Sequence, residues 1–173
     1  MADDPLFSMQ LVTPERVLID GVASEVTLRT GEGDTTFLAG HTPLVGTVEP
    51  GVVRVVDPDG EVRRVAVHGG FVQVEQHVGD DGAEGGGPTA SSGTRVTILA
   101  GVAEPAEEID VERARAARDG AEARVNELAG SGVRTGTGEV DEVDPELADA
   151  QAALLRAEVR LEAAEVTTGA SAA

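Results

Sequence analysis

The most informative stretch of this sequence is Phe37-Leu38-Ala39-Gly40-His41-Thr42-Pro43-Leu44-Val45-Gly46-Thr47-Val48-Glu49-Pro50-Gly51. It holds two turns framed by glycine, on either side of one short apolar run. Glycine permits a positive φ, while Pro43 holds its own φ at about −65° and favours an extended Thr42. The backbone must therefore reverse twice within a small space. His41 lies in the first turn, where composition alone predicts a turn histidine bonded to nearby backbone.

The segments around this stretch have the pattern of short β-strands. Alternation of Val26 and Leu28 with polar residues indicates a sheet with one wet face, and Val22 is expected on the same side. Asp57-Pro58-Asp59-Gly60 predicts a hairpin turn, because the ligand spacing of a calcium-binding EF-hand is missing. Many short strands with frequent turns indicate a sandwich or barrel. The predicted strands, rich in Val and Thr, are Ser8–Val12, Val22–Thr30, Val52–Asp57, Val62–Val67, Phe71–Glu75 and Val96–Leu99.

The composition limits the classes of protein to which the chain can belong. No apolar run is long enough to span a bilayer and the N-terminus does not look like a signal peptide, so a soluble intracellular protein is expected. A formal charge of −19 argues against binding nucleic acid or a membrane surface directly. The chain has no cysteine, and all 13 of its basic residues are arginine, which excludes thiolate metal sites, P-loops and Schiff-base chemistry. Aromatic residues make up only 2%, so the core is expected to consist of Val, Leu, Ile and Ala.

The last third of the chain changes to a helical pattern. Asp110 is a predicted N-cap for a helix over Val111–Leu128, which Gly130 ends. Asp144-Pro145-Glu146 is a second helix start, for a helix over about 145–166. The expected apolar stripes are Ala114, Ala117, Ala121, Val125 and Leu128 on the first helix, and Leu147, Ala150, Leu154, Ala157, Leu161 and Ala164, at heptad spacing, on the second.

The predicted fold is therefore mixed, β and then α. An N-terminal antiparallel β-sandwich is expected over residues 1–104, and a C-terminal antiparallel hairpin of two helices over residues 105–173. A Gly/Ser/Asp-rich segment at about 77–93 predicts a flexible insertion at a hairpin tip, and a Gly/Thr-rich connector lies between Gly130 and Val143.

Four short motifs occur in one order along the sandwich: Gly31-Glu32-Gly33-Asp34, Ala39-Gly40-His41-Thr42-Pro43-Leu44, Glu49-Pro50-Gly51 and His68-Gly69-Gly70-Phe71. Followed by a strand and two Ala-rich helices, they resemble the ε subunit of the rotary F-type ATP synthase over nearly the whole chain. The insertion at 77–93 departs from that family, in which the corresponding connection is short.

The resemblance implies a non-catalytic subunit of the central stalk, which couples proton translocation to ATP synthesis and regulates ATP hydrolysis. Its implied partners are the γ subunit, the c-ring, and the α and β subunits. It would be a peripheral protein at the cytoplasmic face of the cell membrane, reaching the membrane only through the c-ring. The implied interface residues are Glu32 and Asp34, facing the c-ring, and Gly40, His41, Pro43 and Leu44, near γ.

The resemblance also implies a regulatory ATP site, although no cofactor is required. Some ε subunits bind ATP through a motif on the first helix, an upstream glutamate and arginines on the second helix. The matching residues here are Glu104, Ile109, Asp110, Arg113, Ala114, Arg156 and Arg160. Gly120 departs from the family, because nucleotide-binding members carry an arginine there. Asp110 is equally explained as a helix cap, and Arg113 as a partner of surface acids.

Other interpretations remain open. A helical hairpin whose seam is rich in alanine buries little apolar surface, which favours a hairpin that can move from one docking surface to another. A permanently docked hairpin is an interpretation of comparable weight. A stand-alone β-sandwich adaptor with a coiled-coil arm is the alternative function. A small hydrolase using His41 or His68 lacks a paired nucleophile in the sequence, and the three histidines, with His77, are too few for a predicted zinc site.

Overall fold

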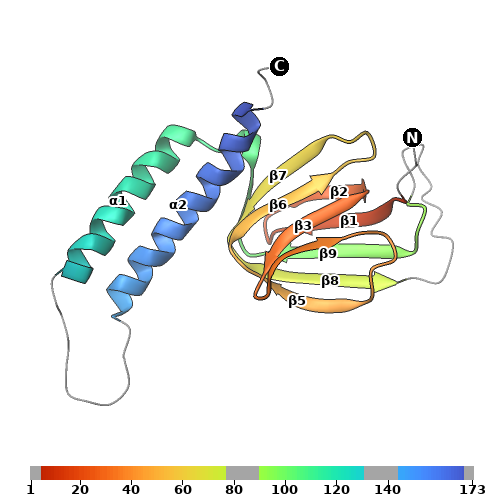
Figure 1. The fold of residues 1–173 in the computed structure, drawn as a ribbon, viewed down its shortest axis with the longest axis horizontal. Helices are drawn as coiled ribbons and strands as arrows, with labels where there is room; N and C mark the ends of the chain where they lie inside the picture. The colour runs from red at the N-terminus through yellow and green to blue at the C-terminus, as the bar shows by residue number, and fades with distance from the viewer. Residues whose placement is uncertain (1–4, 77–89, 131–143, 170–173) are drawn as a thin grey trace, which may run out of the picture. The chain divides into compact units, whose positions relative to one another are not determined.

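The structure, a computed structural model, describes residues 5–76, 90–130 and 144–169, with side chains as far as residue 164 in the last range. The chain folds into two compact units, Met1–Glu108 and Ile109–Ala173. The first unit is built of strands and the second of helices (Figure 1). The strands are β1 Phe7–Val12, β2 Val17–Ala23, β3 Glu25–Thr30, β4 Gly33–Phe37, β5 Leu44–Val48, β6 Gly51–Val56, β7 Val62–Val67, β8 Gly70–Gln76, β9 Thr94–Ala100 and β10 Ala103–Pro105.

The strands form one continuous ladder in the order β10-β7-β6-β3-β5-β8-β9-β1-β2, with β4 paired to β3. β3 and β5 share a single residue pair, Thr30 and Val48, and the ladder folds over itself there to make the predicted sandwich. Every pairing is antiparallel except that of β1 with β9, which is parallel. β1 and β9 are far apart in sequence, so no hairpin turn dictates their relative direction.

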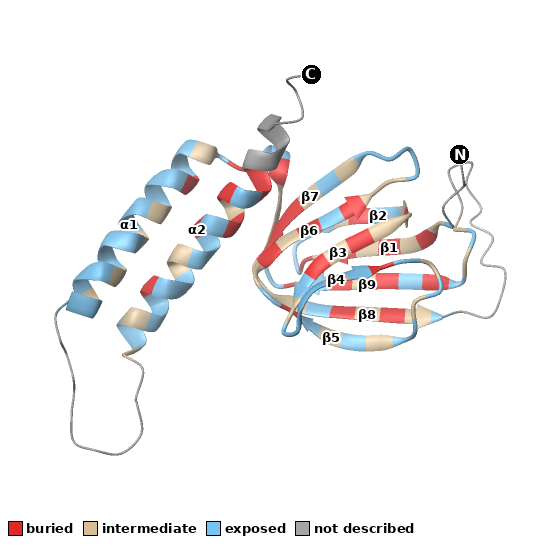
Figure 2. Ribbon diagram, in the orientation of Figure 1, coloured by how far each residue is buried: buried red, intermediate tan, exposed pale blue. Residues whose placement is uncertain are grey.

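Apolar residues alternate inward on both layers and meet in one core (Figure 2). Val26 and Leu28 of β3 are buried on one layer, and Val72 and Val74 of β8 on the other. The core is largely aliphatic, as expected, but its two largest side chains are Phe7 and Phe37, both fully buried. Two of the few aromatic residues therefore lie at the centre of the sandwich.

The predicted strand Val22–Thr30 was wrong, because the chain breaks at Ser24 into β2 and β3. The Ser24 N–H and hydroxyl both donate to Val56 O, at 2.9 and 3.3 Å. The break changes the phase of the alternation, so Ala23 is buried and Val22 is not. Most of β2 and the whole of β4, β5 and β10 were also not predicted. Their sequences are polar, contain glycine or proline, or are very short, and such sequences resemble turns.

Of the three predicted connections, the structure describes one in full and one in part, and the third lies outside the described residues. The turn at Asp57–Gly60 is confirmed, with the Gly60 N–H donating to Asp57 O at 2.9 Å. Within the predicted insertion, residues 77–89, including His77, lie outside the described residues, but Ser91 and Ser92 donate backbone hydrogen bonds to Leu6 O at 2.9 and 3.1 Å. The connector at 131–143 also lies outside the described residues.

The second unit is an antiparallel hairpin of α1 Val111–Gly130 and α2 Pro145–Gly169 (Figure 1). Both predicted caps are confirmed. Asp110 Oδ1 accepts the Arg113 N–H at 3.0 Å, and Asp144 Oδ1 accepts the Glu146 N–H at 2.9 Å. An ion pair of 2.7 Å between Arg124 and Glu146 joins the end of α1 to the start of α2.

The predicted apolar stripes, which form the seam between the two helices, are confirmed on α2 and wrong at one position of α1. On α1, Ala117 is exposed, while Arg118 is half-buried. Spacings of three and four residues from Ala114 lead to Arg118 and Ala121, which is the period of helices packed along a seam. Arg118 therefore lies at the seam position in place of Ala117, and its guanidinium forms an ion pair of 2.6 Å with Asp119.

Gly70 is a position where the sandwich tolerates no side chain. A Cβ on Gly70 would lie 2.1 Å from Leu99 O, a backbone atom that cannot turn away. We predict that Gly70→Ala lowers the free energy of unfolding by about 2–3 kcal/mol. Urea unfolding of the purified chain measures this.

Gly21→Ala is the matched control, because nothing lies within 4 Å of its Cβ position. We expect it to change the free energy of unfolding by less than about 0.5 kcal/mol. Equal stability of the two variants would contradict the close approach of β8 and β9.

Candidate interaction surface

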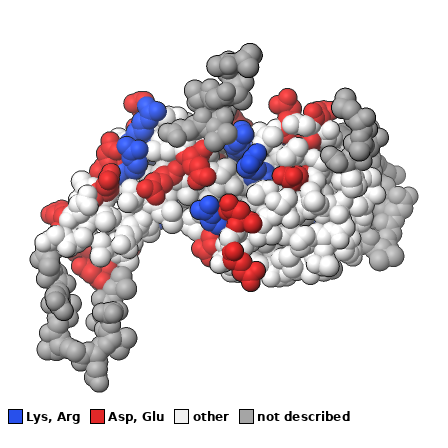
Figure 3. Space-filling model, in the orientation of Figure 1, with Lys and Arg blue, Asp and Glu red and all other residues white. Residues whose placement is uncertain are grey.

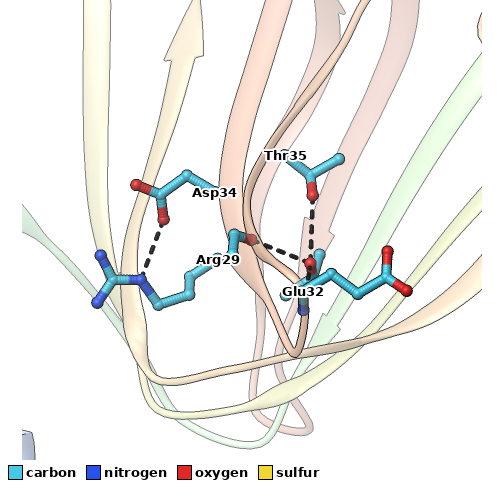
Figure 4. A network of polar contacts seen from close by, with 6 residues as sticks. Arg29, Glu32, Asp34 and Thr35 are labelled. Carbon is cyan, nitrogen blue, oxygen red and sulfur yellow. Dashed lines mark hydrogen bonds and ion pairs between the residues drawn. The ribbon is translucent and has the colours of Figure 1, made fainter.

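The turn between β3 and β4 is held by a network of short polar contacts (Figure 4). The Thr30 hydroxyl donates to Gly33 O at 3.0 Å, accepts the Glu32 N–H at 3.3 Å, and lies 3.2 Å from the Thr35 hydroxyl. Gly33 has a φ of 115°, which favours glycine at this position. The acidic turn is therefore a shaped projection of the sandwich.

The two acidic side chains of this turn differ in their surroundings. Arg29 Nε donates to Asp34 Oδ1 at 3.0 Å, so part of the Asp34 charge is balanced within the turn. The Glu32 carboxylate points away from the network (Figure 4) and forms no ion pair with any residue in the described ranges. Glu32 thus offers an exposed negative charge on a fixed backbone.

The turn that follows β4 contains the predicted γ-facing residues and is tied to the sandwich by its backbone. Gly40 has a φ of 81°, and its N–H donates to the Thr94 hydroxyl at 2.7 Å. His41 O accepts from Gln76 Nε2 at 2.7 Å, and the His41 N–H donates to Leu38 O at 3.1 Å. The distances show a turn whose shape depends on β8 and β9.

The His41 ring is oriented on two sides. Nδ1 lies 2.8 Å from Thr42 O, and since a carbonyl only accepts, Nδ1 carries the proton and neutral His41 has an unprotonated Nε2. The ring packs edge-on against Phe37, with centroids 4.9 Å apart. The prediction of a turn histidine bonded to backbone is confirmed. In a catalytic triad, the Nδ1 atom of the general base binds a carboxylate, but here Nδ1 already binds Thr42 O.

The two predicted interface segments lie at opposite ends of β4. Its five residues separate Gly33 from Phe37 by about 13 Å at the usual rise per residue. The acidic turn, Gly31–Asp34, and the His41 turn, Leu38–Pro43, can therefore contact different partners at once. Pro43 is exposed and Leu44 is half-buried at the start of β5.

An exposed apolar row, which the sequence pattern did not predict, crosses the outer face of four neighbouring strands. Phe71 pairs with Leu99, Leu99 with Val12, and Val12 with Val17. Phe71, Leu99 and Val17 are 58%, 50% and 53% exposed. The signal was two consecutive apolar residues in a strand, such as Phe71-Val72, which makes both faces apolar. A hollow of about 660 Å³ adjoins this row, lined by Val12, Thr13, Pro14, His68, Gly69, Gly70, Phe71, Leu99, Ala100 and Gly101.

The residues predicted to bind ATP fall in both compact units. Glu104 lies in β10 of the first unit, where its backbone pairs with Ala66. The others lie in the second unit, on or just before α1 and on α2. Ala114 is buried and Arg113 exposed, while Arg156 and Arg160 are one turn apart on α2, exposed and half-buried.

Charge is spread over both units, with acidic and arginine side chains intermixed on the face shown in Figure 3. Glu127 and then Glu146 raise the pKa of Arg124 above its ordinary value, the hydrogen bond to Glu127 being the largest cause. In the part of the chain that the structure describes, no three His, Asp or Glu side chains gather closely enough to hold a metal ion. None of the described helices is long and apolar enough to cross a membrane.

Comparison with known proteins matches both units. The β-sandwich domain of the ATP synthase delta/epsilon chain matches residues 6–78, and the long α-helix domain of that chain matches residues 107–165. The ATP synthase epsilon chain of Desulfitobacterium hafniense (strain Y51) is 34% identical over 158 residues, which cover 91% of this chain and 96% of the relative. That of Symbiobacterium thermophilum is 38% identical over 165 residues, covering 95% and 94%.

A chain of the Euglena gracilis mitochondrial ATP synthase, solved as an assembly of OSCP, F1 and c-ring, has the same fold. Its TM-score is 0.54 at 23% identity, covering 94% of this chain and 79% of that one. Together with the relatives of similar length and the two matched domains, this agreement leads to one assignment. The chain belongs to the family of ATP synthase epsilon chains and is a subunit of the F-type ATP synthase.

Proposed function

We propose that this chain is a non-catalytic subunit of the central stalk, which couples proton translocation to ATP synthesis and regulates ATP hydrolysis through its C-terminal helices. The observation that carries the proposal is the joining of two different elements in one chain. A sandwich with fixed interaction turns precedes a hairpin whose seam contains few large apolar side chains.

The γ subunit is the proposed partner of the His41 turn and of the apolar row. Contiguous exposed apolar side chains mark protein interfaces, and covering the half of Phe71 or Leu99 that is still exposed contributes roughly 1 kcal/mol each. The row lies near the Gly70 end of the β8–β9 pair, and the turn is held at its Gln76 end. A partner that covers both must therefore extend along the length of β8, as an elongated partner surface can.

The c-ring is the proposed partner of the acidic turn. Glu32 is exposed, and its backbone is fixed by the Thr30 hydroxyl, so an interaction with a basic or polar loop costs little ordering. In this arrangement the chain reaches the membrane only through the c-ring, as a peripheral protein on the cytoplasmic face.

The helical hairpin is the proposed regulatory arm, acting on the α and β subunits. Its buried seam is mainly alanine, and burying a methyl group contributes only about 0.8 kcal/mol. Ordering a residue costs roughly 1–2 kcal/mol, so the hairpin depends on docking against another surface. An element with more than one docking surface of similar strength can switch between them.

We predict that a chain ending at Glu108 still assembles with α, β and γ but raises ATP hydrolysis by the complex. This truncation retains the Arg16–Glu108 ion pair of 2.5 Å and the whole first compact unit. Co-purification and steady-state hydrolysis measure the two effects. Unchanged hydrolysis contradicts the regulatory arm, and failure of the full chain to co-purify favours a stand-alone adaptor instead.

We predict that Glu32→Lys reduces proton pumping per ATP hydrolysed, because the reversed charge disturbs the contact with the c-ring. Fluorescence quenching in membrane vesicles, normalised to hydrolysis, measures this ratio. Asp59→Lys is the matched control, since Asp59 is an exposed acid in the β6–β7 turn. Equal pumping ratios for Glu32→Lys and the unaltered chain contradict the proposed contact.

We propose ATP as a regulatory ligand of the hairpin, supported by the shared face of Arg156 and Arg160, whose guanidinium groups suit a polyphosphate. Calorimetry of the full chain at millimolar ATP should give heat of binding, and the double variant Arg156→Ala/Arg160→Ala should abolish it. Arg115→Ala/Arg124→Ala removes the same charge from α1 and should bind ATP like the unaltered chain. No heat with the unaltered chain ends this proposal.

A further inference from the structure

The ladder between β8 and β9 ends in the residue pair Gln76 and Thr94, and both side chains reach the turn Leu38–Pro43. The Thr94 hydroxyl accepts the Gly40 N–H at 2.7 Å. Gln76 Nε2 donates both to His41 O at 2.7 Å and to the Thr94 hydroxyl at 2.8 Å. We call these two side chains the 76/94 clamp.

The central hydroxyl of the clamp is shielded from water. Thr94 is 1% exposed, and it is one of only two buried polar residues in the described part of the chain. A hydrogen bond in such a place is not replaced by water when it is lost, so a donor left without its partner is costly. The clamp therefore discriminates strongly between the observed turn and other conformations of the same residues.

The clamp fixes the part of the turn that local bonds leave variable. Within the turn, the backbone bond between the His41 N–H and Leu38 O closes the chain reversal, but it does not position the turn against the sandwich. Gly40, with a φ of 81°, lacks a side chain to restrict it. The Gly40 N–H and His41 O are the two groups that the clamp holds, and they lie on either side of the peptide bond between Gly40 and His41.

We propose that Gln76 and Thr94 are positioning residues, which hold the turn Leu38–Pro43 in the conformation that docks on the γ subunit. This inference rests on the proposed role of that turn as a γ-facing surface. A clamp with a merely structural role stabilises the sandwich without changing the affinity of the folded chain for its partner. A positioning clamp changes that affinity, because a turn ordered beforehand loses less freedom on binding.

The test compares Thr94→Val, which keeps the shape and removes the hydroxyl, with Thr94→Ser, which keeps the hydroxyl. Binding of the full chain to an assembly of α, β and γ subunits that lacks ε is measured by surface plasmon resonance, and hydrogen exchange of the Gly40 amide by NMR. Thr94→Val removes the acceptor of two hydrogen bonds, and we expect it to weaken binding by about tenfold and to speed Gly40 exchange. Thr94→Ser should resemble the unaltered chain in both.

Gln76→Met provides a second route, because Gln76 is exposed enough for the variant to fold. It removes both donated bonds and should also weaken binding and speed Gly40 exchange. If Thr94→Val does not fold, the comparison of Gln76→Met with the unaltered chain decides the inference by the same two measurements.

Leu38→Asp separates the inference from the proposed function. Leu38 is 50% exposed on the turn and only its backbone is hydrogen-bonded there, so a charge at this side chain disturbs docking directly. Weak binding by Leu38→Asp with normal binding by Thr94→Val and Gln76→Met overturns the clamp and leaves the docking role intact. Normal binding by Leu38→Asp overturns the docking role. Two other results also overturn the positioning role of the clamp. One is weaker binding by Thr94→Val without faster exchange of the Gly40 amide. The other is an equal loss of affinity in Thr94→Val and Thr94→Ser.

Discussion

β8 and β9 pair in one register over seven residue pairs, and most of the proposed interaction surface depends on that register. At one end Gly70 lies against the backbone of Leu99 so closely that no side chain fits. At the other end Gln76 and Thr94 hold the His41 turn. A slip of one residue would exchange the two faces of β8, moving Val72 into solvent and Phe71 into the core.

The same register creates two surfaces of different physical character. The inward residues of β8 and β9 join the largely aliphatic core. Their outward residues, Phe71 and Leu99, leave apolar area exposed at a place where the backbone cannot yield. The acidic turn lies at the far end of β4 from the His41 turn and is a charged surface. An apolar row and a charged turn on one sandwich suit the two proposed partners, which differ in chemistry.

The hairpin differs from the sandwich in how its stability arises. Its helices are well capped by Asp110 and Asp144, but alanine dominates the seam and Arg118 takes one seam position. Capping favours helix formation whichever surface the helices contact, whereas a seam of large apolar side chains would favour one arrangement only. The combination is consistent with helices that persist while their docking changes.

Much of this protein was decided by local sequence. The core strands, the turn at Asp57–Gly60, the helix caps and the heptad stripe of α2 follow from backbone preferences and from apolar periodicity, which act over a few residues. Features that depend on contacts between distant parts of the chain did not follow from them. The break at Ser24 needs the carbonyl of Val56, and the parallel pairing of β1 with β9 joins distant segments. Arg118 reaches the seam only through the packing of two helices. The His41 turn shows both contributions. Its glycine and proline determined that the chain reverses there, but Gln76 and Thr94 decided its position, since hydrogen bonds between residues dozens of positions apart exist only once the sheet has brought them together.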